Sequence, residues 1–311
     1  MVFILPFLLG LLSLDRQSTR IARPIESIYQ FGASKSDTGN GVRISPVPLA
    51  AGRLPYGETF PGKPTGRFSD GRLIIDETTK ALGLPLLDPY QNRNASFKNG
   101  ANFAVASATA LNRTTLLLHG IVPSSAPSLE IQIGWFAEHL RSICSTPSEC
   151  GDRLRNSLIF FGEIGGNDIN YAIDQGKSFD QIRALTPSIV GIVITGIKQV
   201  IAMGASRFIV PGNYPIGCFP SVLIHYAATA DNSTTLHDEN GCVKLANDVA
   251  LHHNQLLKSA LAALSQEHPD VGIEYLNLYD PLLDVIRSPS ENGPFRISYV
   301  VVVSSLSLYR L

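Results

Sequence analysis

The chain has 311 residues, 44% of them hydrophobic and 16% charged, and a formal net charge of -1 at pH 7. That length fits one large α/β domain or two small ones, and no linker-like stretch divides the middle of the chain. Lysines and arginines are scattered, so the sequence has no basic patch of the kind that binds nucleic acid or an anionic membrane.

The N-terminal stretch is apolar from Val2 to Leu14 and then becomes polar. An apolar run of this length is typical of a signal peptide and is too short to span a bilayer. We therefore predict a signal peptide over residues 1–22 and no transmembrane segment. The alternative is a buried core helix. It is disfavoured because this stretch precedes every other predicted element.

The remaining elements follow in chain order. Residues 27–32 form the first predicted strand, which ends in a turn that holds Ser34. Residues 128–144 show helical spacing of apolar side chains, and residues 156–161 form a buried strand that enters the glycine-rich turn "GGND". A helix is predicted from about Thr186, with Pro187 in its first turn, to Gly204. A strand over 206–212, a helix over 243–268 and a strand over 271–280 complete the pattern.

Alternation of strands and helices predicts a mainly parallel sheet with helices on both faces, a three-layer αβα sandwich of the flavodoxin-like kind. In such sheets ligands bind beyond the carboxyl ends of the strands. Ser34 and the "GGND" turn both follow predicted strands. We expect them to share one crevice.

Cysteines and glycosylation triplets agree with a secreted protein. The four cysteines form an even set without metal-binding spacing, and we favour the pairs Cys144–Cys150 and Cys218–Cys242 among three possible connectivities. Asn94, Asn112 and Asn232 each begin an N-x-[ST] sequon. Together with the predicted signal peptide, these features predict an extracellular, cell-wall or vacuolar location.

Several blocks resemble one known family. The first reads "GASKSDTGN" from Gly32, the next two "PTGRFSDGRLIID" and "GANFAVASATAL", and the last two "GGND" and "VPGNYPIGC". In this order they are similar to the blocks of the plant GDSL esterase/lipases, which belong to the SGNH hydrolases. The resemblance implies a hydrolase domain over residues 23–295, followed by a divergent tail over 296–311.

The family's chemistry then assigns roles to the matching residues. Ser34 is the expected nucleophile, and the side-chain amide of Asn167 with the backbone N–H groups of Ser34 and Ser107 are the expected oxyanion donors. The alternative for Asn167 is a turn residue bonded to its own backbone. Supporting residues are Gly32, Asp37, Gly165, Gly166 and Asp168. The expected substrate is a small carboxylic ester or an acylated glycan or metabolite, cleaved through an acyl-serine intermediate without metal or cofactor.

The chain also departs from the family pattern. Ala33 stands where the family has Asp, Lys35 where it has Leu, and Ser107 where it has Gly, a position at which a side chain can disfavour a positive φ. The family's closing D-x-x-H block, which supplies the Asp and His of the triad, is absent, and the sequence continues instead as "RISYVVVVSSLSLYRL". This tail suggests read-through into an intron or a frameshift.

The histidines present do not replace that block. His268 precedes a predicted strand and so belongs at the opposite edge of the sheet, and His253 shares an apolar helix face. The other five are expected mostly at the surface: His119, His139, His225, His237 and His252. We therefore expect impaired activity. The alternative is a non-catalytic relative that binds an ester or glycan, and a structural wall protein has no supporting repeat.

Overall fold

The computed structural model describes residues 24–227 and 236–288. The predicted signal peptide, the sequon at Asn232 and the divergent tail lie outside these described residues.

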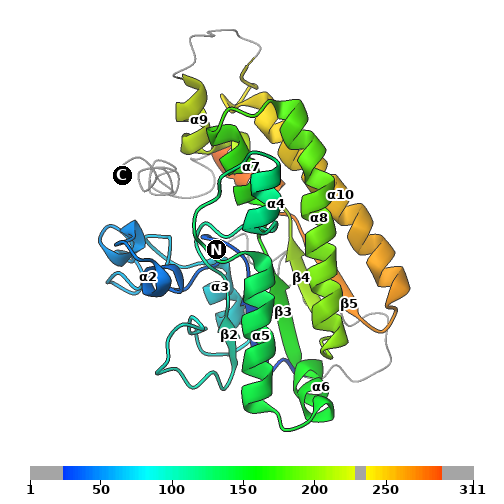
Figure 1. The fold of residues 1–311 in the computed structure, drawn as a ribbon. Coiled ribbons are helices and arrows are strands. Elements are labelled where there is room, and N and C mark those ends of the chain that lie inside the picture. Colours follow the sequence, from blue (N-terminus) through cyan, green and yellow to red (C-terminus); the bar gives the residue numbers. More distant parts are fainter. Residues whose placement is uncertain (1–23, 228–235, 289–311) are drawn as a thin grey trace.

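A five-stranded sheet forms the centre of the molecule (Figure 1). Its spatial order is β2 (Gly100–Asn102), β1 (Ser27–Phe31), β3 (Ser157–Phe161), β4 (Arg207–Pro211) and β5 (Gly272–Leu276). Each neighbouring pair is parallel, so the carboxyl ends of all five strands meet at one edge. The predicted parallel α/β architecture is confirmed.

Helices connect the strands, with two short 3-10 turns between them. In chain order they are α2 (Gly41–Ile44), η1 (Ala50–Gly52), α3 (Ile74–Ala81), α4 (Arg113–Leu118), α5 (Leu129–Ile143), α6 (Pro147–Arg155), α7 (Gly166–Asp174), α8 (Phe179–Ala202), η2 (Ile216–Cys218), α9 (Pro220–Ala227), α10 (Lys244–Glu267) and α11 (Tyr279–Arg287). Figure 1 shows α4 and α7 near the upper end of the sheet, toward which the strand arrows point.

Alternate strand residues supply two separate cores, because successive side chains of a strand point to opposite faces. Phe31 and Phe161 pack with α5, α8 and α10 on one face. Ile28 and Phe160 pack with Ile75 of α3 on the other. Helices therefore cover both faces of the sheet, as the layered prediction requires.

The start of α8 differs from the prediction. The helix begins at Phe179, where Ser178 and Gln181 form a capping box, and Pro187 lies inside it. Proline lacks the N–H that would bond the carbonyl of Arg183, four residues earlier. The hydroxyl of Thr186 donates to that carbonyl at 2.7 Å. This replacement bond lets the helix continue through the proline, which a rule based on proline position does not anticipate.

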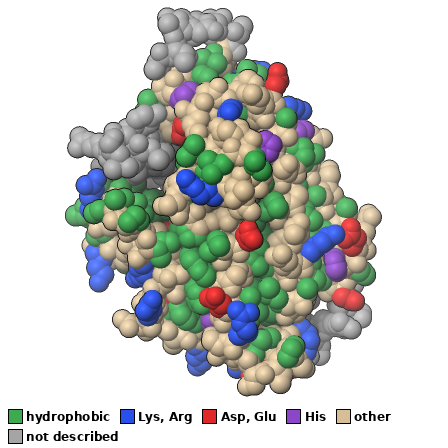
Figure 2. Space-filling model, viewed as in Figure 1, with side chains coloured by type: hydrophobic (Ala, Val, Ile, Leu, Met, Phe, Trp, Pro, Cys, Tyr) green, Lys and Arg blue, Asp and Glu red, His purple; other side chains and the backbone are tan. Residues whose placement is uncertain are grey.

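Among the described residues, α8 is the one helix long and apolar enough to cross a membrane. Ile189, Val193 and Ile197 on its inner face are buried in the main core. Such burial is typical of a core helix in a globular domain. On the face shown in Figure 2, blue and red side chains are interspersed, in line with the scattered charges of the sequence.

Two disulfides stabilise the connections between elements. Cys144–Cys150 joins the end of α5 to α6, and Cys218–Cys242 joins η2 to the segment before α10. These are the pairs favoured from the sequence. The second disulfide fixes the segment that follows β4, at the same edge of the sheet as Ser34.

Candidate active site

Ser34 lies in a turn directly beyond the carboxyl end of β1, a strand with neighbours on both sides. Gln132 of α5 holds the turn from one side, since its side chain accepts from the Gly32 N–H at 3.0 Å and donates to the Gly32 carbonyl at 2.9 Å. The Ala33 N–H donates to the Glu163 carbonyl at 3.1 Å. Ser34 itself is half-buried.

Gly32 is required for this close approach. Its φ is +144°, and a Cβ there would lie 2.9 Å from the Gly162 carbonyl carbon and oxygen, closer than real side chains come. The turns after β1 and β3 therefore touch through backbone alone. The expected supporting role of Gly32 has this steric basis.

Asp37 joins the Ser34 turn to the segment that carries Ser107. Its carboxylate accepts from the backbone N–H groups of Gly39 and Asn40 at 2.7 and 2.6 Å, and from those of Gly41 and Ala106 at 2.9 and 2.8 Å. Burial raises the pKa of Asp37 to about 6, although all these donors favour the charged form. Since Ala106 directly precedes Ser107, Asp37 positions both segments.

Ser107 adopts a left-handed backbone with φ of +67°. A side chain is expected to disfavour a positive φ at this position, but the surrounding hydrogen bonds hold the backbone there. The Ala106 N–H donates to Asp37, and the Tyr171 hydroxyl donates to the Ser107 carbonyl at 3.5 Å. A non-glycine residue in this region costs about 1–3 kcal/mol. Ser107 is strained, and its side chain remains half-buried at the site.

The "GGND" turn begins α7. Gly165 is its N-cap with a φ of +100°, and Asp168 accepts from the N–H groups of Ala110 and Leu111 at 2.8 and 2.9 Å. Burial raises the pKa of Asp168 to about 7. Asn167 donates one N–H of its amide to the Ala108 carbonyl at 2.8 Å. An amide has two N–H donors, which leaves one for a ligand.

These hydrogen bonds bring the predicted residues together. Ser34, Ser107 and Asn167 belong to adjoining turns that are joined through Asp37, Asp168 and the Ala33–Glu163 backbone bond. All follow strands at the same edge of the sheet. The three turns therefore lie together at one edge of the sheet, and the crevice between them stays a prediction.

Other residues of the site were missed from the sequence. Gln132 lies on a helix far along the chain, and Asn254 of α10 binds the backbone of Asn213 in both directions, at 2.7 and 2.8 Å. Asn213 in turn lies against Gly166, since a Cβ on that glycine would be 3.2 Å from the Asn213 side-chain oxygen. A buried polar residue on an apolar helix face was the available signal in both cases.

No described histidine hydrogen-bonds the Ser34 hydroxyl. His253 is buried beneath Gly165, and burial lowers its pKa to about 4. His268 ends α10 ahead of β5, at the opposite edge of the sheet. The surface expectation is wrong for His139, which is 2% exposed among the rings of Tyr29, Tyr90, Phe97 and Phe103 because it faces the core side of α5.

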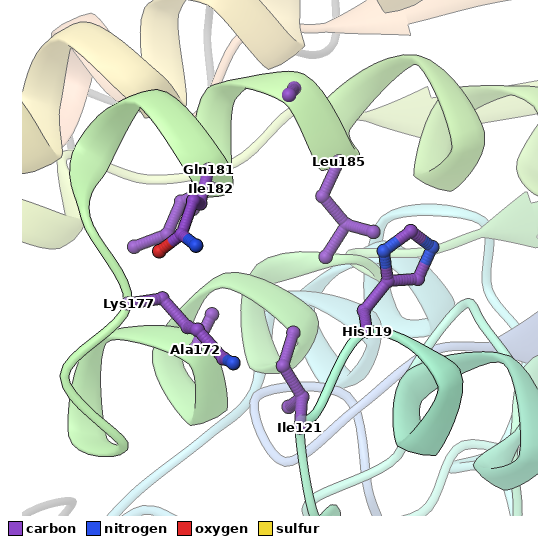
Figure 3. Close-up of a pocket in the computed structure, with 8 residues that line it drawn as sticks. His119, Ile121, Ala172, Lys177, Gln181, Ile182 and Leu185 are labelled. Atoms are coloured by element: carbon purple, nitrogen blue, oxygen red, sulfur yellow. The ribbon is translucent and has the colours of Figure 1, made fainter.

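A surface hollow of about 220 Å³ lies apart from this site, between the end of α4, α7 and the start of α8 (Figure 3). Its lining includes His119, Ile121, Lys177 and Leu185, and it shares no residue with the turns around Ser34. In the described part of the chain, no group of three His, Cys, Asp or Glu side chains is arranged to hold a metal ion.

The serine turn and the glycine-rich turn lie at the carboxyl edge of a parallel α/β sheet, which is where ligands bind in sheets of this kind. The chain belongs to the GDSL-like lipase/acylhydrolase family, whose model matches residues 28–292. By family it is a carboxylic ester hydrolase.

Plant esterases are among its relatives. Acetylajmalan esterase 2 from Rauvolfia serpentina is 45% identical over 274 residues, which cover 87% of this chain and 74% of that protein. Acetylajmalan esterase from the same plant is 46% identical, with coverage of 87% and 69%. Sinapine esterase from Brassica napus is 40% identical over 277 residues, with coverage of 87% and 70%.

Proposed function

We propose that this chain cleaves carboxylic esters through an acyl-serine intermediate formed on Ser34. The Ser34 oxygen attacks the ester carbonyl carbon, the alcohol leaves, and water then releases the acid. The free N–H of Asn167 and the backbone N–H groups of Ser34 and Ser107 would stabilise the oxyanion. The observation that carries the proposal is the set of hydrogen bonds that holds these three turns together.

We further propose that turnover is lower than in relatives with the full family pattern. Ala33 removes a carboxylate beside the nucleophile, Lys35 adds a charge there, and Ser107 adds strain and a side chain at an oxyanion donor. A serine hydroxyl also needs a base, and the described histidines lie elsewhere. Catalysis by the described residues alone would lack that base, which is expected to slow acyl transfer.

The same departures favour a second candidate, a non-catalytic protein that uses this crevice to bind an ester or glycan. The two candidates differ in one measurable respect. A binding protein would bind the ester but show no turnover that depends on the Ser34 hydroxyl.

Secretion is part of the proposal. Two disulfides are typical of an oxidising compartment, and the sequon residues Asn94 and Asn112 are both exposed. The exposed positions of Asn94 and Asn112 are compatible with glycan attachment. Expression in a secreting plant host, followed by glycosidase treatment and mass spectrometry, tests the location and both sites.

The catalytic test compares hydrolysis of 4-nitrophenyl acetate by the wild-type chain, Ser34→Ala and Ser125→Ala. Ser125 is an exposed serine outside the site and serves as the matched control. Serine catalysis predicts that only the first substitution abolishes turnover. Equal rates for all three proteins would remove Ser34 from the mechanism.

A repaired variant separates the two candidates. Ala33→Asp, Lys35→Leu and Ser107→Gly together, with a family-type D-x-x-H segment appended, should raise turnover by several powers of ten if only those parts are missing. A folded protein that stays inert after this repair but still binds an ester would favour the binding candidate.

A further inference from the structure

Two aromatic rings close to Ser34 are in contact with a cation from the chain itself. The Lys35 ammonium lies 4.3 Å from the centre of the Phe219 ring and 5.3 Å from that of Tyr214. The two ring centres are 6.2 Å apart at an interplanar angle of 48°. Paired aromatic faces at these distances are the usual receptor for an organic cation.

A buried carboxylate completes this cluster. Burial lowers the pKa of the Lys35 ammonium, and the charge of Glu163, a residue that is 7% exposed, offsets part of this shift. The Oε1 atom of Glu163 has no hydrogen-bond partner in the described part of the chain. No ion pair among the described residues joins it to Lys35. Glu163 Oε1 is therefore a buried acceptor without a partner, and the charge of the carboxylate acts on the Lys35 ammonium from beyond ion-pair distance.

The four residues come from three adjacent strands of the sheet. Lys35 follows Ser34 after β1, Glu163 follows β3, and Tyr214 and Phe219 follow β4. The disulfide at Cys218 fixes the backbone next to Phe219. Lys35 is the chain neighbour of Ser34 and consecutive Cα atoms are about 3.8 Å apart, so the cluster lies within the length of one lysine side chain of the nucleophile's backbone.

We propose that Tyr214, Phe219 and Glu163 form an organic-cation subsite beside Ser34, and that the ammonium of Lys35 fills it. The Lys35 side chain thereby occupies the subsite. An ester whose alcohol bears an ammonium group would be excluded from the occupied subsite and repelled by the charge of Lys35. Lys35 is then the specificity-determining residue that directs the crevice to esters of neutral alcohols.

The chemistry of the lining argues for a cation over other ligands. An anion would face the Glu163 carboxylate and the negative faces of two rings, which repel it. A neutral apolar group would gain no electrostatic attraction from the carboxylate or from the negative faces of the rings. An ammonium group is attracted both by the ring faces and by the negative charge of the carboxylate.

Binding of tetramethylammonium, measured by isothermal titration calorimetry, tests the subsite without any need for catalysis. Lys35→Leu and Lys35→Met should bind this probe about tenfold more tightly than the wild-type chain. Adding Phe219→Leu or Glu163→Gln to either variant should remove most of that gain. The matched control is Lys258→Leu. The Lys258 ammonium lies 4.8 Å from the centre of one ring, that of Tyr275, whereas Lys35 lies over two rings.

Equal binding by the wild-type chain, both Lys35 variants and the Lys258 control would overturn the proposal. Failure of both Lys35 variants to fold, judged by circular dichroism, would also overturn it, since the ammonium would then be a structural requirement and not an occupant.

The specificity consequence rests on the proposed function and has its own readout. Acetylcholine and its uncharged analogue 3,3-dimethylbutyl acetate differ only in the charge of the alcohol. Lys35→Leu should shift the ratio of their kcat/KM values about tenfold toward acetylcholine. Absence of turnover of both esters, together with the expected tetramethylammonium binding, would count against the proposed function and leave the subsite supported. Turnover with an unchanged ratio would contradict the specificity role.

Discussion

Asp37→Asn is the substitution that most directly tests how the site is held together. The carboxylate accepts from four buried backbone N–H groups, at distances from 2.6 to 2.9 Å. An asparagine has one acceptor oxygen, so its NH₂ group would face two of those donors, at Gly41 and Ala106 or at Gly39 and Asn40. Each buried N–H left without an acceptor costs about 1–3 kcal/mol.

Replacing a charged group with a neutral one recovers part of this loss, because the amide is cheaper to bury. We therefore expect Asp37→Asn to lower the free energy of unfolding by about 3 kcal/mol and the melting temperature by about 5–10 °C. Urea unfolding followed by circular dichroism at pH 8, where the carboxyl is ionised, measures the change. Asp270→Asn, at an exposed turn, is the control.

A loss of less than about 1 kcal/mol, or a loss equal to that of the Asp270 control, would refute the reasoning. It would mean that the four N–H groups find water or other acceptors and that Asp37 does not organise the turns. A loss near 3 kcal/mol accompanied by unchanged esterase activity would place Asp37 in stability alone.

Three further predictions concern strain, acidity and the proline in α8. Ser107→Gly should raise the free energy of unfolding by up to about 1 kcal/mol in urea titrations, because relief of the left-handed backbone exceeds the chain entropy of glycine; a loss would contradict the assigned strain. His139 has a folded pKa of about 4, below its usual 6.5, so the unfolded chain binds more protons between these values and acidification destabilises the fold. His139→Phe should therefore lose about 2 kcal/mol less than the wild-type chain between pH 7 and pH 5 in thermal melts, and an equal loss would refute this. Thr186→Val should cost about 1 kcal/mol, and less in a Pro187→Ala background, where residue 187 regains its N–H; equal costs in both backgrounds would show that the hydroxyl does not replace the missing bond.

The sequence predicts those parts of the site that depend on local pattern. The strand over 27–32 and the turn at Ser34 follow from an apolar run and small residues, and the observed β1 ends at Phe31. The buried strand before "GGND" is β3, which ends at Phe161. Parallel pairing then brings their carboxyl ends together, which requires no knowledge of side-chain contacts.

Residues that act across long chain separations were not predictable in the same way. Gln132 lies 100 residues from the glycine it binds, and Asn254 lies 41 residues from Asn213. Helical periodicity places both on buried faces but does not name their partners. The prediction of where α8 starts was wrong for a related reason. The Ser178 cap sets the start of the helix, and the Thr186 hydroxyl lets it continue past a proline that normally marks a helix start.

The contact between Ala33 and Glu163 also has a consequence for biosynthesis. The two residues are 130 positions apart, and the bond between them supports the turn of Ser34. At about 5–20 residues per second, a ribosome needs roughly 7–26 s to add that length of chain, and longer before Glu163 leaves the exit tunnel. During this interval β1 exists without its neighbour β3, and its apolar residues are accessible to chaperones. The serine turn is thus encoded early but can be completed only after residue 163 has been made.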